Sequence, residues 1–424
     1  MRFHNLSEGL NHLYNLRKAG IKYDLVQMSL GLDELGNPHL SYPAVQIAGT
    51  NGKGTTAALL ESILRHHGYK TGLFTSPHLT NYRERIKVNG HNIKDTQILH
   101  LLNKLANLDT HLSFFETTTA LAHQYFNNQK IDLAIFEAGL GGRLDSTNLC
   151  NSVLAIITSV STDHQAFLTA STSRITWEKS GIVKPGVPVL IPRTVPMIRK
   201  QLLKYSTARG GLPVVAGEDY YLCKLDQIYQ FKYKNDPPLF LQTLPFSGGN
   251  KFYLVESALA AARIILQKPL NSPIIKTAFS NYNWPGRFEI IENFILDGAH
   301  NPQAAQELAF NIKNSCSPPV NIITGMMSDK DYQNFYQPLL PLAKTFYLTN
   351  FNNSNAVPEN ILKDYLDGWG AHTKLFNNDL QTLLNNLKSD TITIVCGSFY
   401  LAGEVRRILL QQKKDLLPLS DPRN

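Results

Sequence analysis

One stretch near the N-terminus constrains the fold of this chain more than any other. The apolar run Val45–Ala48 leads into Gly49–Thr56, a turn rich in glycine and threonine with one lysine. Apolar residues then follow at helical spacing, and Gly68 stands where such a helix would end. The pattern predicts a strand, a tight turn and a helix. Because glycines let backbone N–H groups converge on an anion at a helix start, we expect this turn to bind nucleotide phosphates.

Within the turn, Lys53 would supply a mobile cation for the outer phosphates, and Thr55 could reach a bound Mg²⁺. The common pattern G-x-x-x-x-G-K-[ST] is not met, because Ile47 occupies its first glycine position and Gly54 separates the lysine from its threonine. A chance glycine turn with a surface lysine is the alternative interpretation. The expected nucleotide contacts are Thr50, Asn51, Gly52, Lys53, Gly54, Thr55 and Thr56.

Length and composition predict a globular protein of two or three domains. The 424 residues are 43% hydrophobic, enough for sizeable cores at ~150 residues per domain. No apolar run approaches the ~18 residues of a membrane span, and the first residues lack a signal peptide's apolar region. We therefore expect a cytoplasmic protein with no membrane partner. The scattered cysteines, interpreted as buried reduced thiols, are Cys150, Cys223, Cys316 and Cys396.

The formal net charge of +8 would attract polyanions such as nucleotides or acidic substrates. The densest basic clusters are Arg406–Arg407 and Lys413–Lys414, in a helical pattern without interleaved aromatic residues. That pattern does not favour nucleic acid as a partner. We interpret these clusters as a solvent-exposed helix face.

Strand-like and helical runs alternate along the chain, which predicts an α/β fold. The first series of strand-like runs covers residues 44–48, 72–75, 133–136, 153–158 and 187–191. Residues 205–250 look like an antiparallel excursion or an irregular insertion, and a second alternating series begins at Phe294. We expect a P-loop-type, mostly parallel sheet domain over residues 1–285 and a smaller Rossmann-like α/β domain over residues 286–424. Polar clusters at the strand ends predict a site at the carboxyl edge of the sheet.

Those polar clusters form an ordered set of motifs that covers nearly the whole chain. They are Gly49–Thr55, Thr75–Leu79, Glu84–Ile86, Glu137–Asn148, Asp163–His164, Glu178–Ile182, Gly286–Phe288, Asp297–Pro302, Asp329–Asp331 and Gly397–Gly403. Together they resemble the bifunctional folylpolyglutamate synthase/dihydrofolate synthase family, a branch of the Mur ligase superfamily. The resemblance implies a monomeric ligase in which ATP phosphorylates a carboxylate and the amino group of glutamate attacks the acyl phosphate.

The implied substrates are ATP, L-glutamate and either dihydropteroate or folates, with Mg²⁺ at two sites. Both activities are favoured, and folylpolyglutamate synthase activity alone is one alternative. Another Mur-type amino-acid ligase would be expected to carry an extra N-terminal domain. A phosphate-binding regulator or ATPase without ligase activity fits less well with Glu137, His164 and Lys179 together.

The resemblance also assigns roles to individual residues of the first domain. It implies Ser76, Glu137 and His164 as metal ligands, and Lys179 as a carbamylated lysine that joins Lys53 in catalysis. Taken singly, each has a structural alternative, such as a turn residue, a surface charge or a hydrogen-bonded histidine.

Substrate-binding roles follow in both domains, each beside a simpler alternative. Glu116 is an expected substrate contact but could equally cap the following helix, and Arg143 and Asp145 could only shape their turn. The second domain is expected to close over the first and exclude water. Its implied residues are Arg287 and Asp297 for ATP, the catalytic His300, and Ser398 and Tyr400 on the glutamate side.

One position departs from the family pattern. Relatives usually carry an asparagine near adenine where this chain has Glu256. A glutamate can accept a hydrogen bond from the adenine amino group but lacks a donor for a ring nitrogen. We therefore expect either altered nucleotide selectivity or a shifted register.

Overall fold

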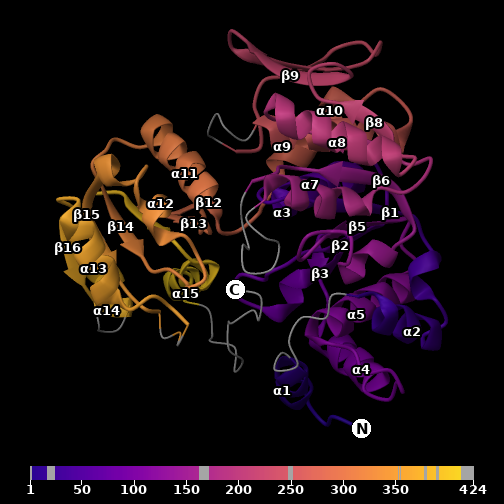
Figure 1. Cartoon of the computed structure of the whole chain (residues 1–424), viewed down its shortest axis with the longest axis horizontal. Helices are drawn as coiled ribbons and strands as arrows, with labels where there is room; N and C mark the ends of the chain where they lie inside the picture. Colours follow the sequence, from indigo (N-terminus) through magenta and orange to yellow (C-terminus); the bar gives the residue numbers. More distant parts are fainter. Residues whose placement is uncertain are drawn as a thin grey trace. The chain divides into compact units, whose positions relative to one another are not determined.

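The computed structural model describes residues 2–16, 24–161, 171–246, 252–351, 353, 355–376, 380–387 and 391–411. They form two compact units, each described separately below (Figure 1). The first unit runs to His78, continues from Tyr82 to Pro245 and ends with Phe252–Tyr282. The second holds Leu79–Asn81, Phe246 and the described residues from Asn283 onward. The expected domain division after residue 285 stays a prediction.

An eight-stranded sheet forms the centre of the first unit, in the order β4-β3-β2-β5-β1-β6-β7-β8. Neighbouring strands from β2 to β8 are parallel, and β3 and β4 are antiparallel at one edge, which confirms the mostly parallel sheet. β1 lies in the interior of this order, and all five of its residues are buried. The strands are β1 (Ala44–Ala48), β2 (Thr71–Phe74), β3 (Ile86–Val88), β4 (His91–Asn92), β5 (Leu133–Glu137), β6 (Ser152–Ile157), β7 (Pro188–Ile191) and β8 (Leu212–Val215).

Helices surround this sheet, and α3 starts immediately after the glycine-rich turn, as the sequence predicts. It packs against α9 and α10, and Gly68 just beyond its end has a φ of 93°, which suits glycine. The helices are α1 (Leu6–Asn15), α2 (Val26–Glu34), α3 (Lys53–His66), α4 (Asp95–Leu105), α5 (Phe114–Gln129), α7 (Thr172–Lys179), α8 (Pro196–Ala208), α9 (Phe252–Leu266) and α10 (Ser272–Ser280). Short 3-10 turns are η2 (Pro38–Leu40), η3 (Tyr82–Arg85), η4 (Ser146–Leu149) and η5 (Ser180–Ile182).

The region 205–250 contains the expected antiparallel strands, but its first strand belongs elsewhere. β9 (Tyr220–Leu225), β10 (Ile228–Tyr233) and β11 (Leu239–Leu241) form a separate antiparallel sheet, and the turn Asp226–Gln227 joins β9 to β10 (Figure 1). β8, by contrast, pairs in parallel with β7 and extends the main sheet. The expectation of an antiparallel excursion was wrong for β8, because its buried Val214 and Val215 continue the main core.

The second unit has a six-stranded sheet in the order β12-β13-β17-β14-β15-β16. Only β12 is antiparallel to its neighbour, so the Rossmann-like α/β prediction is confirmed. The strands are β12 (Arg287–Ile291), β13 (Phe294–Asp297), β14 (Val320–Thr324), β15 (Ala343–Leu348), β16 (Thr373–Leu375) and β17 (Thr393–Cys396), and the helices are α11 (Pro302–Ser315), α12 (Tyr332–Tyr336), α13 (Glu359–Gly368), α14 (Leu380–Asn386) and α15 (Phe399–Leu409), with η7 (Leu340–Leu342). Side chains of α11 and α13 join one apolar cluster, and those of α14 and α15 join a second.

Two smaller expectations need correction. The Arg406 side chain is only 14% exposed and pairs with Glu289 at 2.9 Å, so it is not part of a solvent-exposed face. Arg407 pairs with Glu404, and Lys413–Lys414 lie outside the described residues. The cysteines are free thiols, but only Cys150 and Cys396 are buried, while the other two are half-buried. In the described residues, no helix is both long and apolar enough to cross a bilayer.

Candidate active site

The glycine-rich turn after β1 adopts a shape that larger residues would not allow. Gly52 has a φ of 81°, and a Cβ atom there would lie 2.3 Å from Leu254 Cδ2. A Cβ atom on Gly49 would lie 1.9 Å from Thr158 Oγ1. Both distances are far below ordinary contact, so the close backbone packing at these two positions requires glycine.

Hydrogen bonds tie this turn to the end of β6. Thr50 N donates to Ser159 O at 2.9 Å, and Thr50 Oγ1 donates to Ser161 O at 3.0 Å. Asn51 N donates to Ser159 Oγ at 2.8 Å, while Thr158 Oγ1 donates back to Asn51 O at 2.7 Å. This support was not predicted from the sequence. A run of hydroxyl residues directly after an apolar strand was the available signal.

The start of α3 provides donors for an anion. By helical geometry the N–H groups of Lys53, Gly54 and Thr55 have no acceptor inside the helix. The Lys53 ammonium lies over the turn, donating to Gly49 O at 3.0 Å and Thr50 O at 3.2 Å. A phosphate group fits this cradle of backbone donors and one cation. Thr56 does not fit its predicted role, because its side chain is fully buried and its N–H donates to Gly52 O.

Two of the three predicted metal ligands lie together at the ends of the adjacent strands β2 and β5, and β5 is next to β1. Ser76 follows β2 and Glu137 ends β5, and Ser76 N donates to Glu137 Oε2 at 2.9 Å. Glu137 is also the register partner of Ile47, which places it next to the glycine-rich turn Gly49–Thr56, called the phosphate turn below. His164 lies outside the described residues. The described part of the chain holds no group of three or more His, Cys, Asp or Glu side chains arranged for a metal. The hydroxyl and carboxylate oxygens present suit Mg²⁺.

The loop after β5 is braced internally by Asp145. Its Oδ2 accepts from Leu140 N at 2.8 Å, and its Oδ1 accepts from Thr147 N at 3.1 Å and Thr147 Oγ1 at 2.7 Å. The carboxylate is buried and spans both sides of the glycine-rich segment. These contacts match the alternative that Asp145 shapes its turn.

Arg143 joins the same loop to the end of α7. Its Nε and Nη2 each donate to Glu178 at 3.2 Å, and its guanidinium carbon lies 4.4 Å from the centre of the Trp177 ring. Arg143 N also donates to Glu178 O at 2.9 Å. Lys179, the last residue of α7, is 4% exposed, so a buried lysine directly follows the glutamate that Arg143 contacts.

Glu116 forms part of the N-terminal cap of α5. Its Oε2 accepts from Ser113 N at 2.8 Å, and Ser113 Oγ accepts from Glu116 N at 3.5 Å. The capping alternative is therefore present in the structure. A substrate contact by Glu116 stays a prediction.

The expected residues of the second unit meet at the carboxyl edge of its sheet. β13 and β17 are adjacent, and Gly397 N donates to Ala299 O at 2.8 Å, which joins the loops that carry Asp297–His300 and Ser398–Tyr400. Arg287 is the register partner of Asp297, and its guanidinium carbon lies 3.9 Å from the Phe399 ring centre. Ser398 caps α15, with Tyr400 N donating to Ser398 Oγ at 3.1 Å. Within this unit the five predicted residues form one group.

Arg85 and His78 form a buried pair that the sequence did not reveal. Arg85, part of the Glu84–Ile86 motif, is fully buried, and its Nε donates to His78 Nδ1 at 2.8 Å. Its guanidinium carbon also lies 5.4 Å from the Phe114 ring centre. Only long-range packing explains this burial, and a local charge pattern carries no signal of it.

Comparison with known proteins places this architecture. Residues 47–188 match the Mur ligase middle domain, and residues 289–409 match the C-terminal domain of dihydrofolate synthetase. The dihydrofolate synthase/folylpolyglutamate synthase of Bacillus subtilis is 30% identical over 422 residues, covering 92% of this chain and 96% of that relative. The chain belongs to the dihydrofolate synthase/folylpolyglutamate synthase family. It is therefore an ATP-dependent ligase of the Mur type.

Solved structures of the family agree with this membership. Escherichia coli FolC in complex with DHPP and ADP has a TM-score of 0.86 and 28% identity, covering 96% of this chain and 98% of that chain. A bifunctional folylpolyglutamate synthase/dihydrofolate synthase with Mn, AMPPNP and L-glutamate bound has a TM-score of 0.83 and 27% identity, covering 96% of this chain and 98% of that chain.

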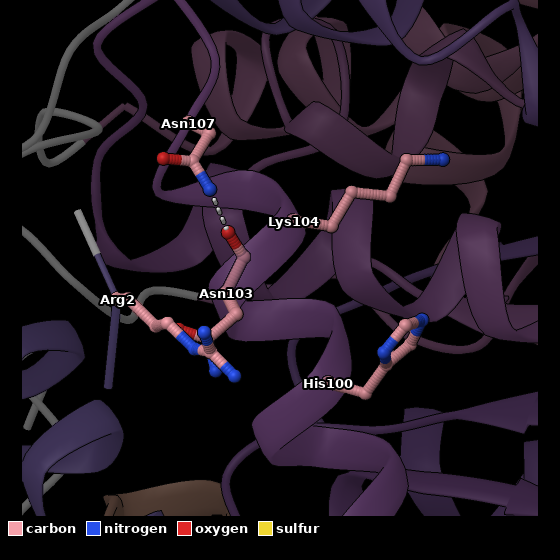
Figure 2. A pocket seen from close by; sticks show the side chains of 5 residues that line it. All are labelled: Arg2, His100, Asn103, Lys104 and Asn107. Carbon is pink, nitrogen blue, oxygen red and sulfur yellow. Dashed lines mark hydrogen bonds between the residues drawn. The ribbon is translucent and has the colours of Figure 1, made fainter. Parts of the chain in front are cut away.

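A separate hollow of about 660 Å³ lies on the first unit, between the N-terminal segment and α4. Figure 2 shows that its basic side chains diverge, because Lys104 is turned away from Arg2 and donates to Gln124 Oε1 at 2.8 Å. Asn107 Nδ2 donates to the Asn103 carbonyl at 2.7 Å. Since the cations do not converge on one point, this hollow offers no anion site comparable with the phosphate turn.

Proposed function

We propose that this protein joins L-glutamate to dihydropteroate and to the γ-carboxylate of folates that already carry glutamate, using ATP. The observation that carries the proposal is the placement of a phosphate cradle beside Ser76 and Glu137 on adjacent strand ends. A carboxylate is a poor electrophile until one oxygen becomes a phosphate leaving group. Its activation therefore needs positioned phosphates and compensation of negative charge.

Residues of the first unit divide this work. The Gly52–Thr55 backbone and Lys53 hold the triphosphate, and Ser76 and Glu137 would hold Mg²⁺. The metal supplies charge neutralisation at the transferring phosphoryl group. The buried position of Lys179 beside the Gly-rich loop is compatible with a carbamate that holds a second Mg²⁺, and His164 completes the proposed ligand set. In the second unit, Arg287 and Asp297 are proposed contacts of ATP, His300 acts near the reacting groups, and Ser398 and Tyr400 bind glutamate.

The decisive experiment incubates the purified protein with ATP, Mg²⁺, L-glutamate and one acceptor, and follows ADP and product mass. Dihydropteroate and a reduced folate are offered in separate reactions. A gain of one glutamyl residue on both acceptors supports the bifunctional enzyme. Product from the folate alone leaves only folylpolyglutamate synthase activity, and ADP release without any amide product would contradict the proposal.

The remaining partners are small molecules. We propose that neither nucleic acid nor a membrane is a partner. The proposed enzyme is an active monomer in the cytoplasm. Light scattering on the active preparation tests the monomer, and a stable mass of two or more chains would contradict it.

A further inference from the structure

An arginine with no assigned role stands at the carboxyl edge of the first unit's sheet. Arg193 lies two residues beyond Ile191, the last residue of β7, on the same edge as the phosphate turn that follows β1. Only β6 separates β1 from β7, so the two strand ends are about 10 Å apart. A nucleoside attached to a phosphate in the turn has a comparable length.

Glu256 on α9 fixes the orientation of this arginine. Arg193 Nε lies 3.1 Å from Glu256 Oε1 and 3.3 Å from Oε2, and Arg193 Nη2 lies 3.0 Å from Oε1. The same Oε1 accepts from Leu222 N at 2.8 Å. The Glu256 side chain is 2% exposed and the Arg193 side chain 51% exposed. A buried carboxylate thus holds a guanidinium whose outer part remains accessible.

The third guanidinium nitrogen of Arg193 is available to a ligand. Nη1 forms no hydrogen bond with any residue in the part of the chain that the structure describes. The planar face of an arginine guanidinium also binds flat rings. The two-point contact with Glu256 holds the Arg193 guanidinium plane in a fixed orientation.

Helix α9 links this arginine to the phosphate turn. Leu254, two residues before Glu256, lies so close to Gly52 that no Cβ atom would fit there. One rigid helix therefore supports both the turn and the arginine. The distance between a phosphate site and the Arg193 guanidinium is set by this shared support.

We propose that Arg193 contacts the purine base of the bound nucleoside triphosphate, a role that rests on the proposed use of ATP. The guanidinium packs against the ring, and Nη1 donates to N7, an acceptor that adenine and guanine share. Arginine has no acceptor for the 6-amino group of adenine, and the Glu256 oxygens are buried and engaged. Weak discrimination between 6-amino and 6-oxo purines follows, which is the altered nucleotide selectivity expected from Glu256 rather than a shifted register.

Calorimetric titration of the full chain tests this role without turnover. The ligands are ADP, GDP and inorganic tripolyphosphate, which shares the phosphates but has no base. The test variant combines Arg193→Met with Glu256→Gln, so that no buried charge is left unpaired and Leu222 N keeps an acceptor. Arg199→Ala, which removes another arginine–carboxylate pair from the same region, is the control.

We expect wild-type affinities for ADP and GDP within about tenfold of each other. The double variant should bind both about tenfold or more weakly, with tripolyphosphate binding and thermal stability unchanged. Equal loss of tripolyphosphate binding, no loss of ADP binding, or a wild-type preference for ADP above about 100-fold would each overturn the inference. A chain that binds ADP in this way but forms no amide would contradict the proposed ligase function instead.

Discussion

Two cationic side chains of the first unit show how position decides what a residue can do. The Lys53 ammonium lies on the phosphate turn itself, while the Arg143 guanidinium is directed to Glu178 and Trp177. Lys53 is therefore placed to contact a phosphate, whereas Arg143 joins the Gly-rich loop to α7. A loop brace acts on the reaction only through the groups it holds in place.

Replacement of Lys53 by Ala should abolish most ligase activity while leaving the fold intact. Loss of one positioned donor to developing negative charge lowers turnover by about 100- to 1,000-fold. The side chain is only partly buried, so the melting temperature should change little. Lys200→Ala, which removes an exposed lysine of α8, is the matched control. An active Lys53→Ala variant would contradict the assigned role.

His123 should make the protein sensitive to mild acid. Burial lowers the pKa of His123 from 6.5 to about 3, so the unfolded chain takes up a proton over a pH range where the native protein does not. Stability contributed by the neutral ring is therefore present above pH 6.5 and is lost as the pH falls towards 3. At pH 5 this residue should lower the free energy of unfolding by about 2 kcal/mol relative to pH 7.

Urea unfolding of the wild type and of His123→Gln at pH 7 and pH 5 measures this effect. The variant keeps a polar partner for Tyr42, whose hydroxyl lies 2.9 Å from His123 Nδ1. Its stability should change less between the two pH values than that of the wild type. His100→Gln, at an exposed histidine, should behave as the wild type does. An unchanged pH dependence in His123→Gln would rule out this origin of acid sensitivity.

At the scale of single elements, the strand–turn–helix unit proposed to bind phosphate was predictable, but its supports were not. Glycines, an apolar strand and a helical pattern lie within about twenty residues, so their local sequence carries the information. The hydroxyl groups after β6 and the burial of Arg85 depend on residues far apart in the chain. β8 was missed as a parallel strand for the same reason, since only its pairing with β7 identifies it.

The cap of α5 provides a test between two roles of Glu116. Ser113→Ala and Glu116→Ala each remove one side of the same capping box, and each should lower the free energy of unfolding by about 1 kcal/mol. If Glu116 acts only as a cap, both variants should retain the wild-type KM for the folate acceptor. A raised KM in Glu116→Ala alone would show that the carboxylate contacts substrate.

On the scale of the whole molecule, each unit has an apolar core of its own. One cluster in the first unit gathers side chains of β1, β6, β7 and α8, and two clusters cover the faces of the second unit's sheet. Separate cores are a condition for separate folding. The fold class of both units was predictable from alternating strand and helix patterns, because each pattern repeats several times.

Calorimetric heating should therefore resolve two transitions. ADP at about 100 times its Kd should stabilise the unit that carries the phosphate turn by about 2.7 kcal/mol and raise its transition temperature. The second transition serves as an internal reference. One transition that moves as a whole with ADP would show that the two units unfold cooperatively.

The tip of the β9–β10 hairpin is a suitable site for inserting another protein domain. Asp226 and Gln227 are exposed, the left-handed Asp226 has a φ of 50°, and the strands on either side are paired along their full length. Exposed loop tips with paired flanks tolerate inserted sequence. A fluorescent protein fused into this hairpin after Asp226 would lie four residues beyond Leu222, whose N–H donates to Glu256, the carboxylate that holds Arg193. Nucleotide occupancy could then be followed as light emission in a living cell.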